Sequence, residues 1–74
     1  MADFSIAPLW REVAGPGISG HTKPVQLQRG CLLVCVDSSA WKMELDRHYK
    51  DRILNKLGAK DPRIKSIRFQ VGQI

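Results

Sequence analysis

Two neighbouring stretches rich in apolar residues, 23–29 and 31–37, predict a β-hairpin. In the first stretch Val25 and Leu27 alternate with glutamines, so that one face of the strand is apolar. Gly30 supplies the tight link between the strands, because glycine adopts a positive φ without steric cost. The chain is therefore expected to fold back on itself at this glycine.

The second of these strands is apolar on both of its faces. Leu33 and Cys35 point to one side. The other side is formed by Leu32, Val34 and Val36. A strand that is buried from both sides is usually central in its sheet. Pro24 in the first strand has no backbone N–H to donate to a neighbouring strand, which suits an edge position. We therefore expect the first strand to be outermost and the second to be central.

A third strand is predicted over residues 64–71. Its inward face is expected to carry Ile67, Phe69 and Val71. Its outward face is expected to carry Ser66, Arg68 and Gln70. This alternation is typical of a strand with one face on the core and the other in solvent.

Residues 5–15 predict a first helix. Ser5 can cap its amino end, and Pro8 is tolerated because it falls in the first turn. The apolar edge of this helix is formed by Leu9, Trp10 and Val13. Gly15, Pro16 and Gly17 are expected to end it.

A second helical region follows Asp37, because two serines at this point offer oxygen acceptors to the first-turn amides. It is expected to run to about Leu57 and to end at Gly58. Its apolar residues stand four apart, at Trp41, Leu45, Tyr49, Ile53 and Leu57. On a straight α-helix such a row drifts by about 40° per step, or about 160° in all. We therefore infer a kink or a break near Tyr49–Asp51.

The predicted order of elements is α-β-β-α(α)-β. The segment between the second and third strands is a crossover connection, which is right-handed in nearly all sheets and places the third strand parallel to the second. The expected architecture is an α+β fold, with a three-stranded mixed sheet covered by helices on one face. The 74 residues leave no room for a second core, so residues 1–74 form a single domain.

The composition, 43% hydrophobic and 26% charged, is ordinary for a globular protein. Twelve Lys and Arg against seven Asp and Glu give a net charge of +5, which favours anionic partners such as nucleic acid or acidic proteins. No apolar run approaches the roughly 20 residues that span a bilayer, and the first four residues lack the features of a secretory signal. A cytoplasmic location without a membrane partner is therefore expected.

The sequence contains no pattern typical of catalysis or metal binding. Cys31 and Cys35 would lie about 13 Å apart along one strand, too far for a disulfide, and no second Cys or His pair completes a zinc site. His21 and His48 are far apart in sequence, with no carboxylate placed as an obvious partner. We therefore predict no enzymatic activity, no cofactor, no metal and no small-molecule substrate.

The densest group of cations lies on the second helical region. It consists of Arg47, Lys50, Arg52 and Lys56. Asp46 and Asp51 counter it in part, for example through an i, i+4 pair of Arg47 with Asp51. The other cations are expected to contact phosphates, which position a protein on DNA without specifying sequence.

The outward face of the sheet is a second candidate surface. Arg68 stands there with three glutamines, and it is predicted to contact nucleic acid. Leu33 and Cys35 of the central strand offer apolar surface to a protein partner. Tyr49, near the inferred kink, is expected to be exposed and to stack on bases, whereas the two tryptophans are assigned to the core.

Four segments form a specific pattern across residues 8–72. They are Trp10-x-x-Val13-x-Gly15, His21-Thr22-x-Pro24-Val25-x-Leu27, Gly30-x-Leu32-x-Val34-x-Val36-Asp37-Ser38-Ser39-Ala40-Trp41-x-x-Glu44-Leu45 and Ile64-x-x-Ile67-Arg68-Phe69-x-Val71-Gly72. This pattern resembles the N-terminal domain of the bacterial DciA proteins. The resemblance implies a KH-like fold, DNA binding, and association with the replicative helicase as its loader.

A KH domain usually grips the nucleic-acid backbone with a Gly-x-x-Gly loop between two helices. The corresponding junction here, residues 48–52, contains no glycine. The sequence from Gly17 to Gly20 matches the motif, but it precedes the first strand and is interpreted as a turn. Recognition of a base sequence in the way usual for KH domains is therefore not expected.

Three hypotheses of function stay open from the sequence. The leading one is a DciA-like DNA-binding module that contacts phosphates with little sequence specificity and associates with the replicative helicase. The second is a protein-interaction module that docks a partner at Leu33 and Cys35. The third is an RNA-binding KH-like protein, although DNA is the expected nucleic acid.

Overall fold

The computed structural model describes residues 6–72, and its order of elements confirms the predicted α+β fold. The elements are α1 (Ile6–Ser19), β1 (Thr22–Gln28), β2 (Cys31–Val36), α2 (Ser39–Glu44), the π-helix η1 (Leu45–Tyr49), α3 (Lys50–Lys60) and β3 (Ser66–Val71). None of the helices in this described part is long and apolar enough to cross a membrane.

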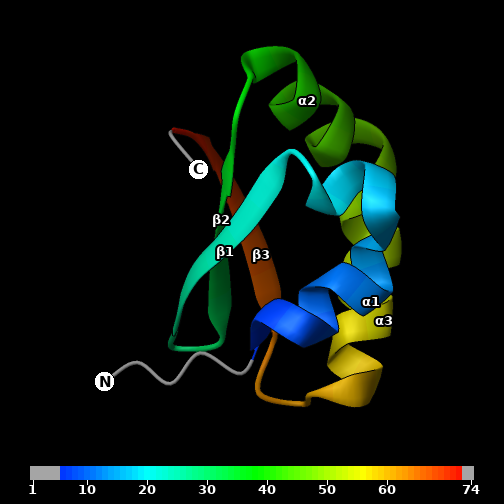
Figure 1. Ribbon diagram of the computed structural model, residues 1–74. Helices are drawn as coiled ribbons and strands as arrows, with labels where there is room; N and C mark the ends of the chain where they lie inside the picture. Colours follow the sequence, from blue (N-terminus) through cyan, green and yellow to red (C-terminus); the bar gives the residue numbers. More distant parts are fainter. Residues whose placement is uncertain (1–5, 73–74) are drawn as a thin grey trace.

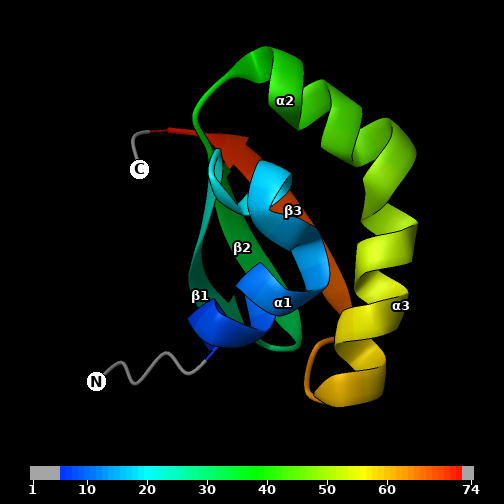
Figure 2. The ribbon, with the colours of Figure 1, turned by 45° about the vertical axis from the view of Figure 1, so that its right-hand side comes forward.

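The sheet has the strand order β1-β2-β3, in which β1 is antiparallel and β3 parallel to β2. This confirms the mixed sheet with β2 at its centre and β1 at an edge. Figures 1 and 2 show the helices together on one side of the sheet. The β1–β2 link is the predicted tight turn, because Arg29 and Gly30 both have positive φ, 53° and 81°.

The core lies between the helices and the inner face of the sheet. Leu32, Val34 and Val36 of β2 have no exposed surface. Leu45 of η1 and Leu57 of α3 are buried to the same extent from the helical side. Each such side chain contributes about 1.5–3 kcal/mol when it is removed from water. These paired layers are therefore the main source of stability.

Trp10 lies in this core, as predicted, and joins α1 to β1. Its side chain is almost wholly buried, and its ring centroid lies 6.3 Å from that of Phe69. The indole Nε1–H donates to Oγ1 of Thr22 at 2.8 Å, and that hydroxyl donates to the carbonyl of Ile18 at 2.8 Å. The only polar atom of the indole is thus satisfied inside the protein.

The chain is helical from residue 39 to residue 60, and the predicted break near Tyr49 takes the form of the π-helix η1. A π turn closes i→i+5 hydrogen bonds and holds more residues than an α turn. A row of side chains four apart therefore drifts less there and stays directed at the core. Its buried members are Leu45, Ile53 and Leu57. Trp41 and Tyr49 pack against them, half-buried.

The start of the second helical region is confirmed, and its end is corrected. Oγ of Ser38 accepts a hydrogen bond from the backbone N–H of Trp41, which makes it the predicted cap. The helix does not end at Gly58 but continues to Lys60. It stops because Asp61 precedes a proline and has extended dihedrals, φ −138° and ψ 98°.

α1 is interrupted at Gly15, whose φ is 89° and ψ 163°. The predicted end of the first helix is therefore a break, after which Pro16 begins a further helical turn. Residues 17–19 belong to that turn, so the interpretation of the sequence from Gly17 to Gly20 as a simple turn is wrong. The predicted cap at Ser5 lies outside the described residues.

Two strand residues expected to face inward are exposed. The register of β1 on β2 shifts between Pro24 and Gln26, and the extra residue of this bulge, Val25, is 44% exposed. Pro24 is buried instead. Val71 is 51% exposed, because it is the last residue of an edge strand.

Replacement of Thr22 by valine is expected to lower the free energy of unfolding by about 1–3 kcal/mol, because the buried N–H of Trp10 loses its acceptor. Thr22→Ser keeps the hydroxyl and should cost less. Urea denaturation followed by far-ultraviolet circular dichroism measures both. In a Trp10→Phe background, which has no N–H to satisfy, Thr22→Val should cost less than in the wild type. An equal cost in both backgrounds would contradict this role of the hydrogen bond.

Candidate nucleic-acid interface

We call the side of the sheet that carries no helix the open face. Strand register aligns its outward side chains in three rows, each of which crosses β1, β2 and β3. The rows, in that strand order, are Gln28–Cys31–Ser66, Gln26–Leu33–Arg68 and Lys23–Cys35–Gln70. The three members on β3 are exposed, which confirms the predicted outward face of this strand.

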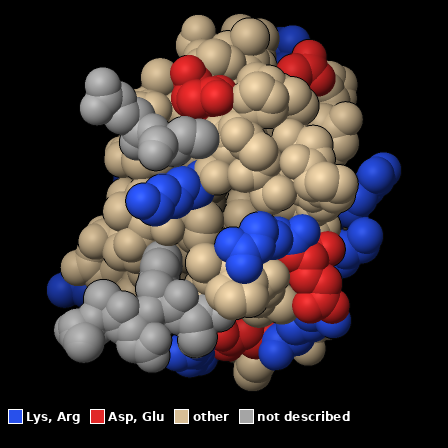
Figure 3. Space-filling model, in the orientation of Figure 1, with Lys and Arg blue, Asp and Glu red and all other residues tan. Residues whose placement is uncertain are grey.

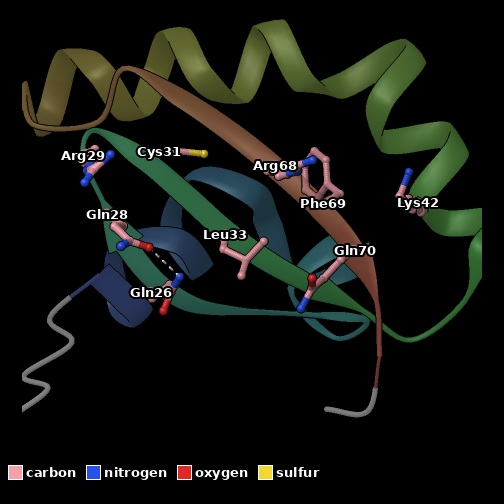
Figure 4. A pocket seen from close by; sticks show the side chains of 9 residues that line it. All are labelled: Gln26, Gln28, Arg29, Cys31, Leu33, Lys42, Arg68, Phe69 and Gln70. Carbon is pink, nitrogen blue, oxygen red and sulfur yellow. Dashed lines mark hydrogen bonds between the residues drawn. The ribbon is translucent and has the colours of Figure 1, made fainter.

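The open face is hollowed. A hollow of about 850 Å³ lies over it, lined by the three strands, the hairpin turn and α2. Figure 4 shows Leu33 between Gln26 and Gln70, with Lys42 of α2 at one end. Nε2 of Gln26 donates a hydrogen bond to Oε1 of Gln28 at 3.1 Å. The hollow therefore presents amides around an apolar centre.

The charge of the open face is positive, because no strand of this sheet contains Asp or Glu. Lys23, Arg29 and Arg68 are exposed, and none of them has an acidic partner among residues 6–72. The ammonium of Lys42 is 3.1 Å from a carboxylate oxygen of Asp46 in η1. The unbalanced cations attract anions to this surface.

The two residues predicted to bind a protein partner differ in accessibility. Leu33 is half-buried at the centre of the middle row. Cys35 is only 9% exposed, and Nε2 of Gln70 lies 3.5 Å from its sulfur. The thiols of Cys31 and Cys35 are free, as their spacing predicts. Leu33 is thus open to a ligand, whereas Cys35 lies beneath the surface.

The four helical cations predicted to contact phosphates do not share one surface. Lys50 and Arg52 project about 200° apart around α3, whereas Arg52 and Lys56 share a flank. That flank faces α1, because Lys60, four residues after Lys56, pairs with Glu12 of α1 at 3.1 Å. Figure 3 shows Lys and Arg side chains on the side of the molecule where α3 lies, with acidic side chains between them.

Among residues 6–72, ion pairs engage a minority of the twelve Lys and Arg residues. Within the described part they are Lys42–Asp46, Lys60–Glu12 and Arg63–Asp61. The predicted pair of Arg47 with Asp51 does not form there. The cations without an acidic partner in residues 6–72 are Arg11, Lys23, Arg29, Arg47, Lys50, Arg52, Lys56, Lys65 and Arg68.

Both histidines have a carboxylate neighbour, which corrects the prediction. Nδ1 of His21 lies 2.9 Å from Oδ2 of Asp37, and its ring stacks on Trp41 with centroids 4.9 Å apart. Nε2 of His48 lies 3.9 Å from Oε1 of Glu44. The first contact depends on strand pairing, whereas the second follows i, i+4 spacing that the sequence already contained. Among residues 6–72 no three metal-binding side chains gather.

Tyr49 is half-buried and packs against the core, so its predicted exposure is wrong. It lines a recess of about 200 Å³ together with Ala40, Trp41 and Glu44. Tyr49, the last residue of the π-helix, belongs to the same inward row as Leu45 and packs against the core. Only part of its ring is available to a ligand.

Comparisons with known proteins agree on one family. The family model described as "Dna[CI] antecedent, DciA" matches residues 2–69. A UPF0232 protein of Mycolicibacterium smegmatis is 36% identical over 59 residues, which is 80% of this chain and 30% of that protein. A UPF0232 protein of Rhodococcus jostii is 38% identical over 71 residues, 93% of this chain and 37% of that protein. The chain thus spans about a third of the length of these curated relatives.

The loop before β3 contains a charge pair whose strength can be measured. The guanidinium and the backbone N–H of Arg63 donate to the carboxylate of Asp61, which lowers the pKa of Asp61 below its ordinary 3.8. This pairing stabilises the folded chain above the ordinary pKa and is lost as the pH falls through the lowered one. An NMR titration of the Asp61 carboxyl carbon should show the depressed pKa, and Arg63→Gln should raise it. An unchanged pKa in the variant would contradict the assignment.

Proposed function

This chain belongs to the DciA family, and from that premise we propose that it is a DNA-binding domain of the helicase-loader type. Lysine and arginine side chains hold the phosphate backbone, with little dependence on base sequence. The family is linked to loading of the replicative helicase, which supports a role at replicating DNA.

The observation that carries the proposal is the set of exposed cations without an acidic partner in residues 6–72. Arg68 and Lys23 stand on the open face, and Arg52 and Lys56 are exposed side chains of α3. A cation in an ion pair must leave its carboxylate to contact a phosphate, whereas these side chains are available. Each phosphate that such a cation neutralises releases a bound counterion and strengthens binding at low salt.

Weak sequence dependence follows from where the cations lie. Sequence in a duplex is read by a helix or a strand pair that enters the major groove and places side chains on base edges. Lys50 lies on one flank of α3 and Arg52 and Lys56 on another, so these cations form no single row that could follow a groove. Phosphate contacts of this kind position a protein and carry no sequence information.

Association with the replicative helicase is the second part of the proposal. Its support is membership of a family linked to helicase loading. The matched region covers about a third of the relatives' length, so the proposal assigns to this domain only a contribution to the contact.

Binding to DNA is expected to weaken steeply as salt rises. The double variant Arg52→Gln, Lys56→Gln should flatten the slope of log K against log salt by up to about 0.9 for each phosphate that is no longer neutralised. The matched control Lys60→Gln, Arg63→Gln removes the same charge from side chains already in ion pairs and should flatten it less. Fluorescence anisotropy at several salt concentrations measures both. Affinity that is absent at low salt, or insensitive to salt, would refute phosphate binding.

In size-exclusion chromatography, a mixture of this chain with a bacterial replicative helicase is expected to contain both proteins in the helicase peak. A basic protein of similar size, such as cytochrome c, serves as the control for association by charge alone. If the chain does not elute with the helicase, or if the control elutes with it to the same extent, the proposed helicase contact is refuted. The proposal of DNA binding is unaffected by either result.

A further inference from the structure

We infer that the open face is a binding site for single-stranded nucleic acid. This inference rests on the proposed function, and it adds where the nucleic acid binds and that it is single-stranded. The helical cations named above are a different surface. The inference therefore concerns what the sheet contributes beyond general attraction of phosphates.

The open face is the side of the sheet that a ligand can reach. The opposite side is covered by the helices, as Figure 2 shows, and its residues on β2 have no exposed surface. The hollow of about 850 Å³ over the open face is larger than the recess of about 200 Å³ beside Tyr49. It extends across all three strands, so it suits an extended ligand.

The middle row places three kinds of chemistry in one line. Gln26 contributes an amide, Leu33 an apolar side chain and Arg68 a planar cation. Neighbouring strands lie about 4.8 Å apart, so the row extends over about 10 Å. The amide of Gln26 makes one hydrogen bond, to Gln28, and keeps further donors and acceptors for a ligand.

An unpaired nucleotide presents the complementary groups. Leu33 offers contact area to the face of a base, and the guanidinium of Arg68 can stack on a base or bind a phosphate. The amides can donate to and accept from base edges. Lys23 belongs to the row at one end of the open face, and Arg29 lies in the turn beside the row at the other end. The two cations can therefore bind phosphates of the nucleic-acid backbone on both sides of the middle row.

A duplex fits this surface less well, because its bases are stacked and its outside is a phosphate surface. Leu33 would then face charged oxygens and lose water without gaining apolar contact. A single strand exposes the base faces that an apolar centre needs. No aromatic residue stands in the three rows, so the guanidinium of Arg68 is their planar group for stacking.

An acidic peptide could use the same cations, but carboxylates need only donors. The three glutamines of the rows donate and accept equally, which suits the mixed edge of a base. The positive charge also disfavours a second copy of this chain on the same face, since like cations would meet. Nucleic acid is therefore the favoured occupant.

The test maps an unlabelled single-stranded oligonucleotide onto the ¹⁵N-labelled whole chain by NMR, at moderate salt. The largest amide shifts are expected in the three rows of the open face. Leu33→Asp should weaken single-strand binding by about tenfold, because the carboxylate removes the apolar contact with a base and repels phosphates. The matched control Met43→Asp adds the same charge on α2, at a side chain that is 58% exposed and does not line the hollow, and should weaken it less.

A second variant keeps the test decisive if Leu33→Asp does not fold. Arg68→Glu changes an exposed side chain and should weaken single-strand binding more than duplex binding. Shifts confined to α3, equal losses in Leu33→Asp and Met43→Asp, or displacement of the oligonucleotide by polyglutamate at the same salt would overturn the inference. DNA binding would survive the first two results. Absence of all DNA binding at low salt would refute the proposed function as well.

Discussion

The rest of the structure depends on how β2 is buried. This strand is apolar on both faces, and the helices cover one of them. Leu32, Val34 and Val36 are fully buried, and their removal from water supplies much of the stability of so short a chain. Leu33 stays half-exposed on the other face. The strand that holds the core together therefore also provides the apolar centre of the open face.

The helical layer is adapted to that buried face. The five residues of the row directed at the core stand four apart, a spacing that a straight α-helix cannot keep on one side over four steps. The π-helix η1 corrects the drift and lets Leu45 and Leu57 reach the same core. The same correction turns Tyr49 inward, where it packs against the core. A packing requirement thus determines how much of the Tyr49 ring a ligand can reach.

The sequence predicts the kinds of side chain in the candidate site but does not show which of them lie together in space. The surplus of Lys and Arg, the absence of acids from the strands and the outward direction of Arg68 follow from composition and alternation. The dense group of cations on the helices is misleading. Lys50 and Arg52 are close in sequence, but the rotation of α3 places them on different sides of the helix. The contact of His21 with Asp37 joins the residue before β1 to the residue after β2 and needs the register of these strands, which no local pattern contains.

The sequence by itself determined the elements, the central position of β2 and the presence of a break in the long helical region, because periodicity, proline and glycine act locally. Only the tertiary structure decided the bulge that exposes Val25 and the alignment of Gln26, Leu33 and Arg68 in one row. Register and side-chain packing are set by contacts between segments far apart in the chain. Strand register and side-chain packing are therefore visible only in the folded chain, where these distant segments are in contact.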